Sequence, residues 1–282
     1  SQNCDDLRKY DLVLYSSNLV IDHFVDLLGA LMEHYKVNKI FLTAKIHFRI
    51  IISFDENRVG GDRMKFYGRE KQKKQLHQLF QSDCQKIALI YGRRRIGKSE
   101  LIRQCLRETK VKSIYYECKQ TTEWNNTDSL SEIVSDVFGY PKLAFESIEQ
   151  LLKFLFEQSQ KEKLILVLDE YPYIRENVKG LDSILQVLVD QYQYDSGMKL
   201  IVCGSYVDTM KSLLSKQNPL YGRVDLTIDL KQMDYFESAL FYQQFSEEDR
   251  VRLYSVFGGI PYYNRLIDSE KTVKENMIDL IA

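Results

Sequence analysis

Cysteine and histidine are scarce in this chain of 282 residues, which contains five cysteines and four histidines. The cysteines are odd in number and form no C-x-x-C pair, and Cys105 and Cys203 lie among apolar residues. We therefore expect reduced thiols, with no disulfides and no zinc site. No histidine falls within the motifs described below, so the sequence gives no support to histidine-based metal or nucleophile chemistry.

Long apolar runs and an excess of one charge are also missing. No stretch reaches the about 20 apolar residues of a membrane helix, and the first residues lack the basic-then-apolar order of a signal peptide. Lys and Arg number 39 against 40 Asp and Glu, a formal net charge of -1. Overall composition thus gives no electrostatic reason for a nucleic-acid or membrane partner. We expect a cytoplasmic protein.

The hydrophobic content of 44% supports one large core and a smaller appendage. Residues 1–63 contain no catalytic motif. Residues 64–230 alternate short apolar stretches with amphipathic helical ones, and residues 231–282 are helical, with a capping box at Ser246 to Asp249 and a helix end at Gly258 and Gly259. We expect an α/β core at 64–230 and a small helical domain at 231–282.

The two ends of the sequence carry separate expectations. Gly60-Gly61-Asp62-Arg63 is a peptide that a purine-rich ribosome-binding site would encode, so native translation is expected to start at Met64. The alternative is a genuine N-terminal extension that packs on the core. Ala282 falls inside a predicted helix, so the natural protein is expected to continue beyond it.

Five apolar stretches of the core predict β-strands. Helical stretches with one apolar face separate them, which is typical of βαβ units and of a parallel sheet covered on both faces. The predicted strands cover residues 86–91, 113–118, 163–168, 199–203 and 224–230.

The segment Gly92-Arg93-Arg94-Arg95-Ile96-Gly97-Lys98-Ser99 has the G-x-x-x-x-G-K-S spacing of a phosphate-binding loop. Glycines let backbone N–H groups curl around phosphate oxygens at a helix N-terminus, whose dipole favours anions. A strand-like run precedes the loop, and a helical stretch from Glu100 follows it. Lys98 would contact the β- and γ-phosphates and Ser99 would bind Mg²⁺.

Arg93, Arg94 and Arg95 occupy the variable positions of this loop. They either add positive potential around the phosphates or point to solvent, and the sequence favours solvent. Together with Ile96 they still belong to the segment from Gly92 to Glu100 that we assign to nucleotide binding.

A second motif is the apolar stretch that ends in Asp169 and Glu170. Parallel strands bury both faces, so both carboxylates emerge at the sheet edge that carries the phosphate loop. Asp169 would hold Mg²⁺ through water, and Glu170 would orient the attacking water. An ordinary acidic strand end is the alternative.

Two further polar residues follow the same logic. Ser205, at the end of a strand, would sense the γ-phosphate or the attacking water, or would cap the helix from Tyr206 to Leu214. Arg223 would neutralise charge on the phosphate in its own site or in that of a neighbouring molecule, or it is a surface arginine at a turn.

These motifs, with four other stretches, resemble the prokaryotic and archaeal-type ATPases of the STAND class, within the AAA-related P-loop NTPases. The resemblance covers most of residues 64–282. The additional stretches are Phe66-Tyr67-Gly68-Arg69-Glu70, Asp169-Glu170-Tyr171-Pro172-Tyr173, Pro219-Leu220-Tyr221-Gly222-Arg223 and Gly258-Gly259-Ile260-Pro261-Tyr262-Tyr263.

The resemblance implies an α/β fold with the strand order 5-1-4-3-2 and a small helical lid. It implies an adenine pocket between Gly68, Arg69 and the lid residue Pro261, and it favours Ser205 as a sensor and Arg223 as a phosphate-responsive arginine. Family members usually continue with a winged helix and a nuclease-like domain. A nucleic-acid partner would therefore act only through a region beyond Ala282.

The function expected on these grounds is Mg²⁺-dependent ATP hydrolysis that drives movement of the lid, with slow turnover. The alternative is a nucleotide-gated switch or scaffold that hydrolyses ATP rarely and passes its state to a C-terminal effector, a protein partner or an oligomer. Glu170 beside Asp169 favours the hydrolase, because a pure binder needs no carboxylate that orients water. Direct nucleic-acid binding and a small-molecule kinase have weaker support.

Overall fold

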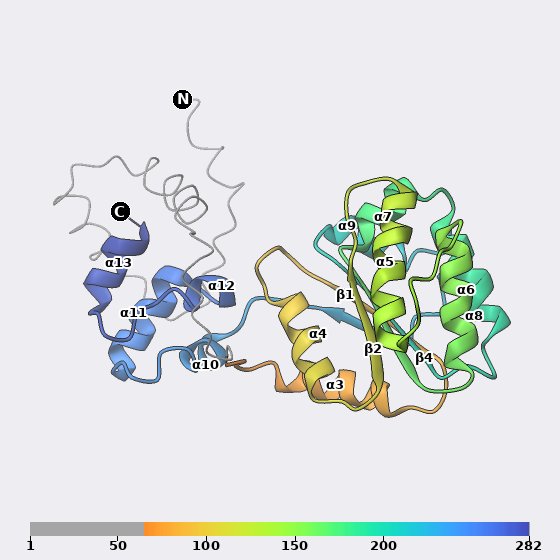
Figure 1. The fold of residues 1–282 in the computed structure, drawn as a ribbon. Coiled ribbons are helices and arrows are strands. Elements are labelled where there is room, and N and C mark those ends of the chain that lie inside the picture. Colours follow the sequence, from red (N-terminus) through yellow and green to blue (C-terminus); the bar gives the residue numbers. More distant parts are fainter. Residues whose placement is uncertain (1–64, 282) are drawn as a thin grey trace, which may run out of the picture. The chain divides into compact units, whose positions relative to one another are not determined.

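The structure is a computed structural model that describes residues 65–281 (Figure 1). The chain divides into two compact units. One comprises Met64–Phe241 with Gly259–Arg265, and the other contains Tyr242–Gly258 and Leu266–Ala282. The expectations for residues 1–63 lie outside the described residues. Within residues 65–281, no helix has the length and apolar character needed to cross a membrane.

The larger unit contains a five-stranded parallel sheet. Its strand order is β2-β3-β4-β1-β5, which confirms the predicted order 5-1-4-3-2. The observed strands agree with the predicted ones to within one or two residues, except that the last strand is shorter. They are β1 (Lys86–Tyr91), β2 (Lys112–Glu117), β3 (Leu164–Asp169), β4 (Met198–Gly204) and β5 (Leu226–Asp229).

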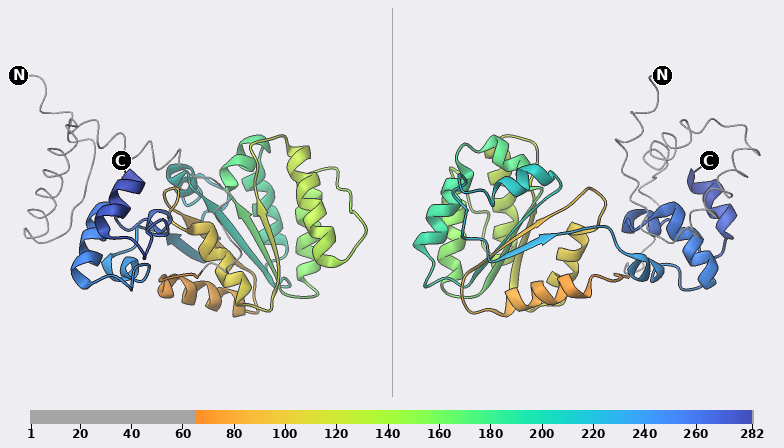
Figure 2. Two further views of the ribbon diagram at one scale, coloured as in Figure 1. Left: turned by 60° about the vertical axis from the view of Figure 1, so that its left-hand side comes forward. Right: turned by 180° about the vertical axis from the view of Figure 1, so that it is seen from behind.

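Helices cover both faces of this sheet (Figure 1, Figure 2). One face carries α3 (Glu70–Gln81) and α4 (Lys98–Arg107). The opposite face carries α5 (Glu123–Phe138), α6 (Ile148–Ser159), α7 (Tyr171–Asn177), α8 (Leu181–Gln191) and α9 (Val207–Ser212). The same unit includes α10 (Tyr235–Ala239) and α12 (Pro261–Asn264), while α11 (Glu247–Phe257) and α13 (Val273–Ile281) belong to the smaller unit.

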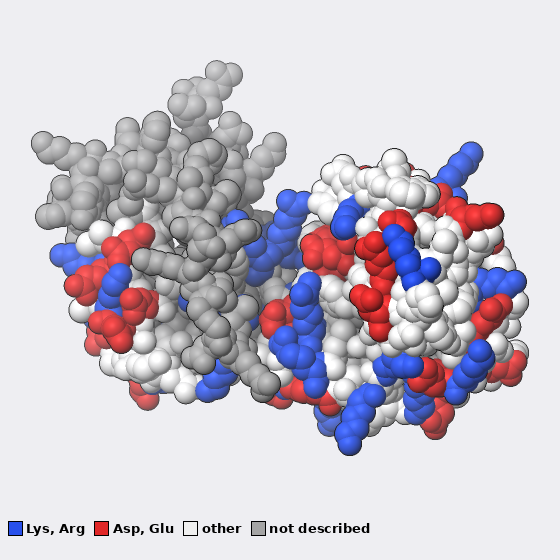
Figure 3. Space-filling model, viewed as in Figure 1, with Lys and Arg blue, Asp and Glu red and all other residues white. Residues whose placement is uncertain are grey.

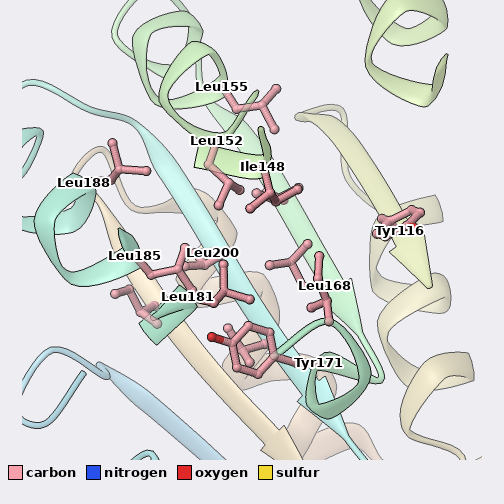
Figure 4. Packing of buried hydrophobic residues seen from close by; sticks show 14 of the residues in the cluster. Tyr116, Ile148, Leu152, Leu155, Leu168, Tyr171, Leu181, Leu185, Leu188 and Leu200 are labelled. Carbon is pink, nitrogen blue, oxygen red and sulfur yellow. The ribbon is translucent and has the colours of Figure 1, made fainter. Parts of the chain in front are cut away.

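The central strand β3 shows why the sheet has two cores. All six of its residues are buried. Leu164, Leu166 and Leu168 face one core, and Ile165 and Val167 face the other, because successive side chains point to opposite faces. Figure 4 shows leucines of α6 and α8 between these helices and the sheet, where they contribute to the first core. This packing holds the end of β3, and therefore Asp169, in a fixed place.

A buried polar network lies under helix α7, directly after Glu170. The carboxylate of Asp182 accepts hydrogen bonds from the Tyr171 hydroxyl at 2.6 Å, from Arg175 Nε at 2.9 Å and from Asn218 Nδ2 at 2.7 Å. Burial and the charge of Asp182 raise the pKa of Tyr171. The network joins α7 to α8 and to the loop that precedes Arg223.

Replacing Asp182 with Ala is expected to lower the free energy of unfolding by about 3 kcal/mol, because the buried partners lose their acceptor. Chemical denaturation measures this change. Asp195→Ala, which removes an exposed aspartate, is the matched control and should change stability by less than about 0.5 kcal/mol. Equal effects of the two substitutions would contradict this role of the network.

Lys199 is a fully buried lysine at the start of β4. Its Nζ donates to the carbonyl oxygens of Cys84 and Gly197, both at 2.8 Å. Burial lowers the pKa of Lys199 from 10.5 to about 8, and the charge of Lys163 adds to this effect. Protonated Lys199 therefore destabilises the folded state below about pH 8, and this cost disappears as the pH rises towards the pKa of the unfolded chain.

Between these two pKa values the unfolded state binds more protons than the folded state, so rising pH stabilises the fold. The wild-type protein is expected to gain stability of the order of 3 kcal/mol relative to Lys199→Met as the pH rises from about 7 to the lysine's ordinary pKa. Denaturant titrations of both proteins at several pH values measure the gain. A stability difference that stays constant with pH would contradict the lowered pKa.

Candidate functional site

The loop from Gly92 to Gly97 connects β1 to the first turn of α4. Gly97 caps the helix with a φ of 91°, a left-handed conformation that favours glycine. A Cβ atom on Gly92 would lie 2.4 Å from the carbonyl oxygen of Leu230, so only glycine fits there. The backbone thus requires glycine at position 92 and favours it at position 97, and the loop ends at a helix N-terminus that favours anions.

Lys98 is buried, with a relative exposure of 5%. Its Nζ donates to the carbonyl oxygens of Gly92 at 3.0 Å and Arg93 at 3.2 Å and to Ser205 Oγ at 2.9 Å. The ammonium group is therefore held inside the curve of the loop and reaches the end of β4.

Ser205, which accepts the hydrogen bond from Lys98, is also bonded to Glu170. Ser205 Oγ donates to Glu170 Oε1 at 2.5 Å, and the Ser205 backbone N–H donates to Glu170 Oε2 at 3.1 Å. One hydroxyl therefore connects the lysine of the loop to the second carboxylate of the acidic pair. Glu170 has a φ of 49°, and such left-handed non-glycine residues concentrate at functional sites.

The alternative assignment of Ser205 as a helix N-cap is wrong. Helix α9 begins at Val207, its N-cap is Tyr206, and no side chain caps it. The hydroxyl of Ser205 is engaged by the Glu170 carboxylate instead.

Asp169 ends β3 with an exposure of 1%. Its Oδ1 accepts the Glu170 N–H at 2.9 Å, and its Oδ2 accepts the Tyr115 hydroxyl. The side chain of Ser99 lies near the same phenol. Burial, followed by the charge of Asp169, raises the pKa of Tyr115. The structure therefore places Ser99 and Asp169 around one tyrosine side chain.

Sequence reasoning did not identify Tyr115 as part of the site. In the parallel register Tyr115 pairs with Val167, two residues before Asp169 on the same face of β3. A long side chain at this position of the neighbouring strand can reach the carboxylate. The proximity of Tyr115 to Asp169 follows only from the register of β2 against β3.

Ser99 and Asp169 offer oxygen atoms as metal ligands. Oxygen ligands suit Mg²⁺, which usually also keeps several water molecules. Among residues 65–281, no group of three or more His, Cys, Asp and Glu side chains could hold a metal ion. A metal ion that takes few protein ligands, and phosphate oxygens for the rest, fits this arrangement.

The three loop arginines differ in their surroundings. Arg93 and Arg94 are exposed. Arg94 donates to the hydroxyls of Tyr173 at 3.1 Å and Tyr206 at 3.4 Å. Arg95 has a φ of 66°, and its guanidinium lies 4.4 Å from the ring centroid of Tyr262. Arg94 thus contacts residues that follow Glu170 and Ser205, whereas Arg95 contacts helix α12.

A small cavity, partly open to solvent, lies beside the loop within the larger unit. Its lining includes Ile96, Gly97, Glu100, Arg69 and Pro261. Two of the predicted base-binding residues, Arg69 and Pro261, therefore line the same cavity as part of the phosphate loop.

Gly68 and Arg69 form a left-handed turn next to this cavity, with φ values of 67° and 62°. The Arg69 N–H donates to Glu237 Oε1 at 2.7 Å, and its guanidinium donates to the carbonyl oxygen of Lys231 at 2.6 Å. Burial lowers the pKa of Arg69, although the charge of Glu237 acts in the opposite direction. Glu237, which the sequence motifs did not indicate, fixes this turn.

Arg223 is not brought to the phosphate loop of its own chain. Its Nε and one terminal nitrogen bind the two carboxylate oxygens of Asp190, each at 2.7 Å, and the other terminal nitrogen donates to Pro219 O at 2.9 Å. Asp225, two residues later, pairs with Ile87 at the beginning of β1. Arg223 therefore lies near the amino ends of the strands, whereas the loop follows their carboxyl ends.

Comparison with known proteins identifies a protein family that matches most of the described residues. The profile described as "ATPase domain predominantly from Archaea" matches residues 66–266. An uncharacterized protein of Methanocaldococcus jannaschii is 32% identical over 200 residues, which cover 70% of this chain and 43% of that protein. The chain thus spans less than half the length of this relative.

Solved structures share the fold at low sequence identity. A Walker-type ATPase of Pyrococcus abyssi has a TM-score of 0.59 at 18% identity, with 77% of this chain and 72% of that chain covered. The ORC2 protein of Aeropyrum pernix, in its ADPNP-ADP complexes, has a TM-score of 0.59 at 13% identity, with coverages of 83% and 72%. These two likenesses establish the fold alone.

Proposed function

Because this chain belongs to the family of ATPase domains found predominantly in Archaea, we propose that it binds ATP with Mg²⁺ at Gly92–Ser99 and hydrolyses the terminal phosphate. The observation that carries the proposal is the hydrogen-bonded chain from Lys98 through Ser205 to Glu170. It joins the phosphate-binding lysine to the carboxylate that would orient water, within one continuous network.

Lys98 would exchange its bonds to neutral carbonyl oxygens for bonds to charged phosphate oxygens, because charge-assisted hydrogen bonds are stronger. The N–H groups of the loop would hold the same phosphates at the start of α4. Ser99 and Asp169 would hold Mg²⁺, which neutralises charge on the phosphate oxygens when it is bound.

Glu170 would orient the attacking water, and Ser205 would report the γ-phosphate. In the structure both carboxylate oxygens of Glu170 are bound by Ser205. Glu170 can accept a hydrogen bond from water only with lone pairs that Ser205 leaves free, or after this pair rearranges. A rearrangement of this pair before the attack would make turnover slow, because a conformational step would precede chemistry.

The adenine base would occupy the cavity between Arg69 and Pro261. Pro261 Cγ lies 3.7 Å from the position that a Cβ would take on Gly97, so α12 lies close to the loop. We propose that loss of the γ-phosphate moves this part of the lid, through the contact between Arg95 and Tyr262.

A slow switch or scaffold of the STAND class is the second candidate, and it requires that Ser205 keeps Glu170 from orienting water while ATP is bound. A partner, an oligomer or an effector region would read the nucleotide state, and Arg223 would then serve the site of a neighbouring molecule. On the face shown in Figure 3, Lys and Arg are interspersed with Asp and Glu over the larger unit, which gives no reason to add nucleic acid as a partner there.

Simultaneous measurement of bound nucleotide and released phosphate tests the proposal and separates the two candidates. A hydrolase releases phosphate continuously when supplied with ATP and Mg²⁺. A switch retains ATP and releases at most about one phosphate per site. Absence of both binding and release would contradict the proposed function.

A further inference from the structure

The hydroxyl of Tyr115 contacts one of the two side chains that the proposed function assigns to Mg²⁺ and lies near the other. It donates to Asp169 Oδ2, and the side chain of Ser99 lies near the same phenol. A hydroxyl has one hydrogen to donate. Since Tyr115 gives its hydrogen to Asp169, its oxygen can act only as an acceptor towards Ser99.

This arrangement restrains the carboxylate ligand and offers the Ser99 hydroxyl an acceptor. A Ser99 hydrogen directed to Tyr115 would leave the lone pairs of Ser99 available for a cation. Asp169 is held at both oxygens, by the Glu170 N–H at 2.9 Å and by Tyr115, so its carboxylate cannot rotate freely. Each of its oxygens still has accepting capacity for metal-bound water.

Arg103 packs against the tyrosine ring. Its guanidinium carbon lies 4.3 Å from the centroid of this ring. Arg103 follows Ser99 by four residues on α4, so both side chains point from the same face of the helix. Three elements, α4, β2 and β3, thus meet around Tyr115.

We propose that Tyr115 is a positioning residue that sets the affinity of the ATP complex for Mg²⁺, an inference that rests on the proposed function. Tyr115 orients Ser99 and Asp169 without itself being a ligand. Groups that hydrogen-bond metal ligands in this way typically change metal affinity by about 10- to 100-fold when they are removed.

The test compares Tyr115→Phe with the wild-type chain. Phenylalanine keeps the ring against Arg103 and removes only the hydroxyl. A fluorescent ATP analogue is titrated first without Mg²⁺, and MgCl₂ is then titrated into each complex. We expect unchanged affinity for the analogue without the metal ion and an affinity for Mg²⁺ about 10-fold weaker. The measurement is of binding, so it is independent of turnover.

Tyr116→Phe is the matched control. Tyr116 is the next residue on β2, and its hydroxyl donates to Asn126 Oδ1 at 2.6 Å, away from Asp169. This variant loses one buried hydrogen bond and should keep the wild-type affinity for Mg²⁺. Retained binding of the analogue without Mg²⁺ shows that each variant is folded.

Two results would overturn the inference alone: Tyr115→Phe and Tyr116→Phe with equal Mg²⁺ affinities, or tighter Mg²⁺ binding by Tyr115→Phe. The second would mean that the phenol competes with the cation. A wild-type chain that does not bind the analogue under any condition would instead overturn the proposed function, and the inference with it.

Discussion

Lys98→Ala is expected to weaken ATP binding by about 100-fold, the loss that follows from removing a charged hydrogen-bond donor to phosphate. Lys98 is buried and is held by three oxygen acceptors inside the loop. Equilibrium titration with a fluorescent ATP analogue measures the effect.

Lys110→Ala is the control for this substitution, because Lys110 is an exposed lysine shortly after α4. It removes the same charge from the chain without touching the loop, and its affinity for ATP should equal that of the wild-type protein. Equal affinities for Lys98→Ala and Lys110→Ala would show that the loop does not bind the phosphates through its lysine.

Glu170→Gln is expected to lower the rate of phosphate release by about 100- to 1,000-fold, with ATP affinity retained. The substitution preserves the shape of the side chain and its capacity to accept the Ser205 hydroxyl through the amide oxygen. It removes the negative charge that would polarise water. ATP should therefore stay bound without being hydrolysed.

Glu176→Gln is the matched control for this prediction. Glu176 is an exposed residue of α7, the helix that begins directly after Glu170. Its substitution should leave both ATP binding and phosphate release unchanged. A Glu170→Gln variant that releases phosphate at the wild-type rate would mean that another group orients the water.

Much of the fold follows from local patterns. The apolar runs of β1, β3 and β4 are buried on both faces, and their composition predicts strands of a parallel sheet. The glycine spacing of the loop predicts its helix-capping geometry, because a Cβ on Gly92 would clash with Leu230 and the left-handed conformation of Gly97 favours glycine. The strand order, in contrast, came from the resemblance to a family.

The start of β5 and the start of α9 show where local patterns are insufficient. Asp225 bonds the backbone of Ile87 through both its main chain and its carboxylate, which replaces regular pairing and shortens the strand. Ser205 matches the composition of an N-cap, but Glu170 is a charged acceptor within reach and takes its hydroxyl. Both outcomes depend on residues far away in the sequence.

The sequence predicts the site residues that belong to motifs. It does not predict the residues that hold those motif residues in place. Glu237 lies 168 residues after Arg69 and nevertheless fixes its backbone N–H. Tyr115 reaches Asp169 only because β2 and β3 pair in one particular register. No spacing rule links such pairs, so a single sequence carries no local signal for them.

The central claim is that the loop lysine and the acidic pair serve one triphosphate. A crystal structure of the chain with a non-hydrolysable ATP analogue and Mg²⁺ tests it most directly. Lys98 Nζ should contact the terminal phosphate, while Ser99 and Asp169 hold the metal ion directly or through water. An analogue bound elsewhere, or phosphates that leave Lys98 on the carbonyl oxygens of Gly92 and Arg93, would contradict the account.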